Sequence, residues 1–269
     1  RYPLVTGVQT CALPICGLAG KLTAAANIHV VDVMPDTLAM LSERFGVTTA
    51  ASPSAVLSSA EVIVLAVKPQ QMRAVVANVK PYMNAQLVVS VAAGIRAADL
   101  SRWLGGHQAI VRTMPNTPAL IGLGITGVFA MAGVSESQRE SADAMLRVVG
   151  ETVWVNDEAQ LDAVTAISGS GPAYVFYFIE AMEQAATELG LSAAQGRQLA
   201  QATFAGAAAL AKASNEPVAQ LRERVTSKGG TTFAALEVMQ ASGVKAALVK
   251  ALHAAADRGR TLGDEFGRD

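Results

Sequence analysis

The run VIVLAVKP, residues 62–69, decides the fold that we predict for this chain. The run begins with six consecutive apolar residues, which is typical of a central parallel strand that helices cover on both faces. Open α/β sheets bind ligands beyond the carboxyl ends of their strands. The end of the run is therefore predicted to be a loop that contacts a cofactor through Ala66, Val67, Lys68 and Pro69. For Lys68 the alternative is an exposed lysine at the end of a strand.

Further apolar runs lie at residues 28–32, 87–91 and 109–114, with helical patterns between them. This alternation predicts an α/β domain with a parallel sheet. Asp32 ends the first of these runs, where the acid of a dinucleotide-binding unit hydrogen-bonds the adenosine ribose. A helix cap is the alternative for Asp32. After the run at 87–91, small residues that include Ala93 would allow close approach of a nicotinamide ring.

The composition changes near residue 157. Strand patterns stop there and alanine-rich helices follow, so we place a dinucleotide-binding domain at residues 17–156 and an all-helical domain at 157–269. Residues 203–213 are almost all small, which suits either a closely packed dimer interface or an internal core helix. The predicted fold class is a Rossmann-like α/β N-terminal domain followed by an all-α C-terminal domain.

A glycine-rich loop precedes one of the predicted helices, which spans residues 233–240. Two glycines before a helix let the backbone turn sharply and approach a ligand. The free N–H groups of the first turn lie at the positive end of the helix dipole. Thr231 and Thr232 add hydroxyl groups, so the loop is suited to a carboxylate. An ordinary threonine cap after a glycine hinge is the alternative.

Residues 1–16 fit none of these patterns. They lack the strand and the Gly-x-Gly-x-x-Gly turn with which a dinucleotide-binding domain starts. The run at 5–15 resembles translated sequencing-adapter sequence joined to a truncated gene; a divergent natural N-terminus is the alternative. We therefore expect the first strand and its glycine loop to be lost or replaced. The central strands would then have an unpaired neighbour, and this exact chain would bind NAD(P)H poorly and turn over little substrate.

The chain has 269 residues, of which 51% are hydrophobic and 16% charged, with a net charge of −1. A large core is available, and this charge gives no electrostatic reason to expect a nucleic acid or an anionic membrane as a partner. No apolar run approaches the roughly 20 residues of a membrane span. No metal-type Cys/His cluster or disulfide scaffold is visible. We expect a cytoplasmic globular protein without a metal site.

Several motifs together resemble the pyrroline-5-carboxylate reductase family over residues 17–262. They are the Ala-Val-Lys-Pro turn at 66–69, the Met-Pro-Asn-Thr-Pro turn at 114–118, the Ser-Gly-Ser-Gly-Pro junction at 168–172, and the loop at 217–240. The resemblance implies reduction of 1-pyrroline-5-carboxylate to L-proline, the last step of proline biosynthesis, with NADPH or NADH. Val33 and Met34, which follow Asp32, favour NADH without excluding NADPH. The resemblance to this family also implies a homodimer, or a higher oligomer built from dimers.

The resemblance further implies roles for individual residues of this chain. Thr232 would be the catalytic group, which orients and hydrogen-bonds the imine nitrogen. Backbone N–H groups around Ser227, Gly230 and Thr231 would hold the substrate carboxylate, and Val225 and Glu158 would line the substrate site. Two other functions stay open: a related imine reductase, and a dimerising helical protein whose nucleotide domain no longer works.

Overall fold

The computed structural model describes residues 2–6, 19 and 22–268, and within it the chain divides into two compact units. One unit comprises residues 1–170 and 255–269, and the other comprises residues 171–254. We predicted the boundary between the two domains at residue 157. In the structure, the first unit also contains residues 157–170 and residues 255–269, which include the end of the last helix.

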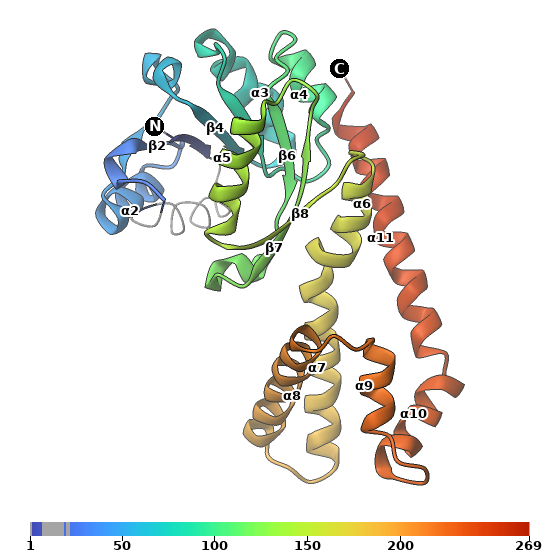
Figure 1. Ribbon diagram of the computed structural model, residues 1–269. Helices are drawn as coiled ribbons and strands as arrows, with labels where there is room; N and C mark the ends of the chain where they lie inside the picture. The colour runs from blue at the N-terminus through green and yellow to red at the C-terminus, as the bar shows by residue number, and fades with distance from the viewer. Residues whose placement is uncertain (1, 7–18, 20–21, 269) are drawn as a thin grey trace. The chain divides into compact units, whose positions relative to one another are not determined.

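The first unit contains a sheet with the strand order β3-β2-β1-β4-β5-β6-β7-β8 (Figure 1). All neighbouring strands are parallel except β6 and β7. The strands are β1 (Tyr2–Thr6), β2 (Ile28–Val31), β3 (Thr48–Ala50), β4 (Val62–Ala66), β5 (Leu87–Ser90), β6 (Ile110–Met114), β7 (Gly124–Ala130) and β8 (Gly150–Trp154).

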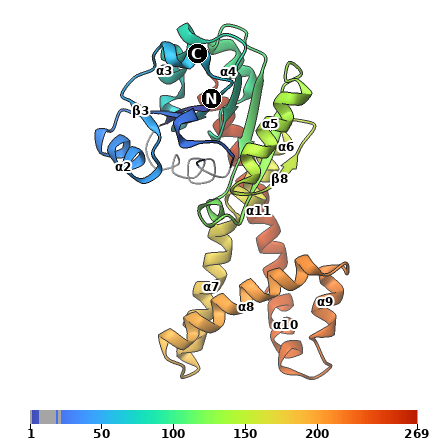
Figure 2. The same cartoon turned by 60° about the vertical axis from the view of Figure 1, so that its left-hand side comes forward.

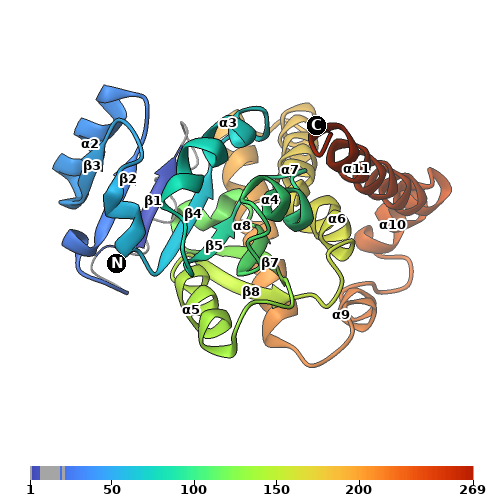
Figure 3. The same cartoon turned by 90° about the horizontal axis from the view of Figure 1, so that it is seen from above.

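Helices cover both faces of this sheet, and Figure 3 shows α3 and α4 on the face opposite α5. The helices are α2 (Pro35–Phe45), α3 (Pro69–Val79), α4 (Ala97–Trp103), α5 (Glu136–Arg147) and α6 (Gln160–Val164). Short turns are η1 (Ala25–Asn27), η2 (Ala55–Ser59), η3 (Lys80–Tyr82), η4 (Thr117–Ile121) and the π-turn η5 (Thr165–Gly169).

The residues of β4 alternate between two buried apolar clusters. Val62 and Val64 belong to the cluster under α2 and α5, while Ile63 and Leu65 belong to the cluster under α3 and α4. An unbroken apolar run is what a strand covered on both faces requires, so the predicted central strand is confirmed.

Our prediction that the first strand is missing was wrong. Tyr2–Thr6 form β1, and Leu4 is in register with Val30 of β2 on one side and with Val64 of β4 on the other. Pro3 argued against a central strand, because proline has no N–H to donate to a neighbour. The facing edges of β2 and β4 nevertheless offer backbone groups to any extended segment, and unpaired buried backbone groups are costly. The expected loss of the glycine loop concerns residues 7–18, outside the described residues.

The second unit is helical and contains α7 (Gly171–Glu188), α8 (Ala193–Ala213), α9 (Val218–Arg224), α10 (Thr231–Ala241) and the first half of α11 (Val244–Phe266). Helices α7 and α8 lie side by side (Figure 2). Among its described residues only Gly196 and Ala200 are buried. Large apolar side chains such as Phe176, Tyr177 and Leu210 are more than 60% exposed. This unit therefore has little core of its own.

None of the helices in the described part of the chain combines the length and the apolar character that crossing a membrane requires.

Candidate functional site

The carboxyl edge of the parallel strands gathers the residues that we predicted to bind a cofactor. Strand β2 ends before Asp32, β4 ends at Ala66, and β5 ends shortly before Ala93. Since β2, β1, β4 and β5 are parallel, these ends lie along one edge. In the sheet, β2 lies on one side of β1 and β4 lies on the other side, so the strand order reverses direction at β1. This edge is thus the topological switch point where doubly wound sheets bind ligands.

The residues at this edge differ in exposure. Ala66 and Val67 are buried, whereas Lys68, at the N-cap of α3, and Ala93 are exposed. Asp32 is buried, and its Oδ1 accepts a hydrogen bond of 2.9 Å from the backbone N–H of Met34. Asp32 thus organises the turn before α2. The small residues at the ends of β4 and β5 and the acid after β2 fit a nicotinamide dinucleotide.

Glu158 lies against the loop that follows β5. Its Oε1 accepts a hydrogen bond of 2.7 Å from the backbone N–H of Ala97, the first residue of α4, and forms an ion pair of 2.9 Å with Nη1 of Arg112. The Arg112 side chain is only 7% exposed and that of Glu158 is 20% exposed. Glu158 therefore fixes the start of α4.

Arg112 and Asp162 belong to the same charged cluster, and the sequence analysis missed both. Burial raises the pKa of the Asp162 carboxyl, although Arg112, Arg96 and Arg260 oppose that shift. An acid whose pKa is shifted by desolvation is a frequent feature of functional sites. The available signal was an arginine inside an otherwise apolar strand, since Arg112 interrupts the apolar run of β6.

The predicted substrate loop lies in the helical unit, between α9 and α10. Helix α10 begins at Thr231, two residues earlier than we predicted, and its N-cap residue, Gly230, has no side chain that could cap the first turn. Gly229 has φ +73°, a left-handed conformation that favours glycine. Val225, the C-cap residue of α9, is exposed, as are Ser227 and Thr231, while Thr232 is half-buried. Among the described residues, the N-cap of α10 thus leaves its first-turn N–H groups uncapped, as an anion cradle requires.

The predicted site residues therefore fall into two groups. Glu158 and the cofactor residues lie in the first unit, whereas Val225 to Thr232 lie in the helical unit.

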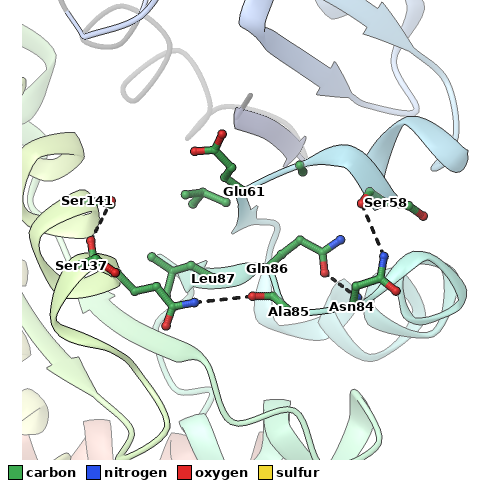
Figure 4. A pocket seen from close by; sticks show the side chains of 11 residues that line it. Ser58, Glu61, Asn84, Ala85, Gln86, Leu87, Ser137 and Ser141 are labelled. Atoms are coloured by element: carbon green, nitrogen blue, oxygen red, sulfur yellow. Dashed lines mark hydrogen bonds between the residues drawn. The ribbon is translucent and has the colours of Figure 1, made fainter.

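A polar pocket of about 550 Å³ opens elsewhere, at the amino edge of the sheet (Figure 4). Its polar groups bond largely to one another: Nε2 of Gln86 donates to the carbonyl groups of Leu57 and Tyr82, and Nε2 of Gln138 donates to that of Ala85. Much of the hydrogen-bonding capacity of the pocket is thus used within the protein rather than offered to a ligand. Because doubly wound sheets bind at the opposite edge, we do not assign the active site to this pocket.

Comparisons with known proteins agree with this geometry. Residues 158–262 match the family described as pyrroline-5-carboxylate reductase dimerisation, and residues 15–94 match the family described as NADP oxidoreductase coenzyme F420-dependent. The chain is 44% identical to the pyrroline-5-carboxylate reductase of Pseudomonas aeruginosa, over 100% of this chain and 98% of the relative.

Solved structures give the same result. The pyrroline-5-carboxylate reductase of Coxiella burnetii is 36% identical with a TM-score of 0.91, and the match covers 97% of both chains. The Plasmodium falciparum pyrroline carboxylate reductase, solved with NADP bound, is 27% identical with a TM-score of 0.87. That match covers 97% of this chain and 98% of the other.

The doubly wound sheet, the helical second unit and the match to an NADP oxidoreductase family identify an oxidoreductase of the nicotinamide-dependent class. The family matches over residues 15–94 and 158–262 identify the family within this class. The chain belongs to the pyrroline-5-carboxylate reductase family, which confirms the family, the enzyme class and the fold class predicted from the sequence.

Proposed function

We propose that the chain reduces 1-pyrroline-5-carboxylate to L-proline and that the loop before α10 binds this substrate. The observation that carries the proposal is the N-terminus of α10, whose N-cap residue Gly230 has no side chain to cap the first-turn N–H groups. The substrate has one carboxylate, which these groups can bind. When bound, NAD(P)H would supply the hydride for the carbon of the C=N bond. The π electrons of that bond move to nitrogen, which takes a proton from water.

The residues of the chain bind and orient the imine in this reaction. N–H groups around Ser227, Gly230 and Thr231 hold the carboxylate, and the Thr232 hydroxyl hydrogen-bonds the nitrogen. A threonine hydroxyl is a poor acid, so Thr232 orients the nitrogen rather than protonating it. Val225 lines the site with apolar surface. Since Oε1 of Glu158 already accepts two bonds, we propose that Glu158 acts toward the substrate through Oε2.

The cofactor contacts proposed for this chain are Asp32, residues 66–69 and Ala93. The cofactor is a nicotinamide dinucleotide, NADPH or NADH. A helical protein without a working nucleotide domain is not favoured, because the similarity to the Pseudomonas aeruginosa reductase extends over the whole chain.

Replacing Thr232 with alanine tests the catalytic assignment. Losing one neutral hydrogen bond costs about 0.5–1.5 kcal/mol, and more if the bond tightens in the transition state. We therefore expect Thr232→Ala to lower kcat by about threefold to tenfold or more while leaving the Kd for NADPH nearly unchanged. Thr226→Ala is the control, because the Thr226 hydroxyl already donates to the carbonyl of Arg222. An unchanged kcat in Thr232→Ala would remove this residue from the mechanism.

We further propose a homodimer, which could build higher oligomers, and a cytoplasmic location. The dimer is supported by the match to a dimerisation family and by the exposed apolar side chains of Phe176, Tyr177 and Leu210. Large exposed apolar patches mark interaction surfaces. Sedimentation of the complete chain at micromolar concentration is expected to give a dimer or a multiple of it. A single monomeric species would contradict the proposal. The location remains a prediction from composition.

A further inference from the structure

The loop between β5 and α4 packs against the last turns of α11, which belong to the same unit. Gly94 lies in this loop with φ +75°. A Cβ atom on Gly94 would lie 3.1 Å from Cδ2 of Phe266 and 3.3 Å from Cβ of Leu262. Two apolar side chains of α11 therefore lie directly against the backbone of this loop.

Arginine side chains where the loop joins α4, and farther along α4, bind the same end of α11. Arg96, the N-cap residue of α4, forms an ion pair of 2.6 Å with Asp264. Farther along α4, Nη2 of Arg102 donates a hydrogen bond of 2.7 Å to the carbonyl of Gly267, just beyond α11. The loop at Gly94 and the helix α4 that follows it thus both contact the same end of α11.

Ala93, the residue directly before Gly94, is the exposed residue of this loop. Phe266 packs against the buried cluster that contains Ala92, Ile95 and Ala97, while Ala93 itself is exposed at the carboxyl edge of the sheet. The arrangement holds the residues around Ala93 and leaves Ala93 accessible to a ligand. Ordering a mobile loop during binding would cost affinity, and a loop that is already ordered avoids that cost.

We infer that Phe266 and Asp264 are positioning residues, which hold the Ala93 loop ready for the nicotinamide end of the cofactor. This inference rests on the proposed cofactor contact of Ala93. Phe266 acts by filling the space against Gly94. Asp264 contributes less, because its side chain is 54% exposed and exposed ion pairs are weak.

The test compares variants of the complete chain by the Kd for NADPH, the KM for each substrate and the Tm. We expect Phe266→Ala to raise the Kd for NADPH about fivefold or more, and Asp264→Asn about twofold, as expected for a loop that must order on binding. The KM for pyrroline-5-carboxylate should change less than the KM for NADPH. Phe266→Leu, which keeps apolar contact with Gly94, should recover most of the affinity.

Glu265→Gln is the matched control. It breaks the exposed Arg258–Glu265 ion pair of 2.7 Å on the same helix end, and we expect the affinity for NADPH to stay unchanged. A Phe266→Ala variant with lower Tm and unchanged affinity would overturn the inference, as would a Glu265→Gln variant with an equal loss. If Phe266→Ala does not fold, the comparison of Asp264→Asn with Glu265→Gln decides. NADPH binding needs no turnover, so a chain that binds NADPH but forms no proline would contradict the proposed function alone.

Discussion

The ion pair between Arg112 and Glu158 gives the sharpest prediction about the first unit. Arg112→Met removes the cation and leaves the carboxylate of Glu158 with the backbone N–H of Ala97 as its remaining bonded partner on Oε1. Removing one member of a buried ion pair typically costs about 3–5 kcal/mol. The Glu158 side chain is 20% exposed, so water reduces the cost and we expect the lower end of that range.

Thermal unfolding measures this cost. A loss of about 3 kcal/mol corresponds to a fall in Tm of roughly 6–12 °C for a unit of this size. Arg147→Met is the matched control, because the Arg147 side chain pairs with Asp143 while 58% exposed. We expect it to cost less than about 1 kcal/mol.

A double-mutant cycle with Glu158→Gln separates the pair from its surroundings. Arg112→Met combined with Glu158→Gln should cost clearly less than the two single changes together, because neither charge then stays buried alone. Strictly additive costs, or a cost of Arg112→Met no larger than that of Arg147→Met, would refute the reasoning.

We predict opposite effects of pH on stability for the carboxyl groups of Asp143 and Asp162. Burial alone would raise the pKa of Asp143, but hydrogen bonds from Thr152, Trp154 and Arg147 outweigh burial and lower it. Asp143→Asn should therefore cost about 1–3 kcal/mol at pH 7, and urea unfolding should show this difference shrinking as the pH falls below about 4. Burial raises the pKa of Asp162 in the folded state. At a pH above the ordinary pKa of an aspartate, the ionised carboxyl therefore lowers the free energy of unfolding. Asp162→Asn should stabilise the fold at pH 7 and have no effect near pH 3, whereas a loss of stability at pH 7 would count against this assignment.

The elements that local sequence predicts well are those whose residues satisfy one strong requirement. Strand β4 is a continuous apolar run, and β5 is apolar and buried up to Ser90. The Ser135–Gln138 and Ser192–Gln195 pairs form the reciprocal hydrogen bonds of a capping box. Both capping boxes are local features, because their donors and acceptors lie within one helical turn.

The features that were missed depend on residues far apart in the sequence. Strand β1 contains Pro3 and is defined by its neighbours β2 and β4 rather than by its own pattern. The partner of Arg112 is 46 residues away, and the last turns of α11 meet a loop about 170 residues earlier in the chain. No local pattern encodes such pairings. The substrate-loop assignment came from motif resemblance and stays a prediction.

Formation of L-proline from 1-pyrroline-5-carboxylate tests the central claim most directly. The complete chain is compared with a variant in which a Gly-x-Gly-x-x turn replaces part of residues 7–18, because the sequence there lacks the glycine pattern that binds pyrophosphate. We predict that both chains form L-proline in step with NAD(P)H oxidation, and that the variant binds NAD(P)H more tightly and turns over faster. Absence of L-proline from both chains, although NADPH binds, would contradict the account.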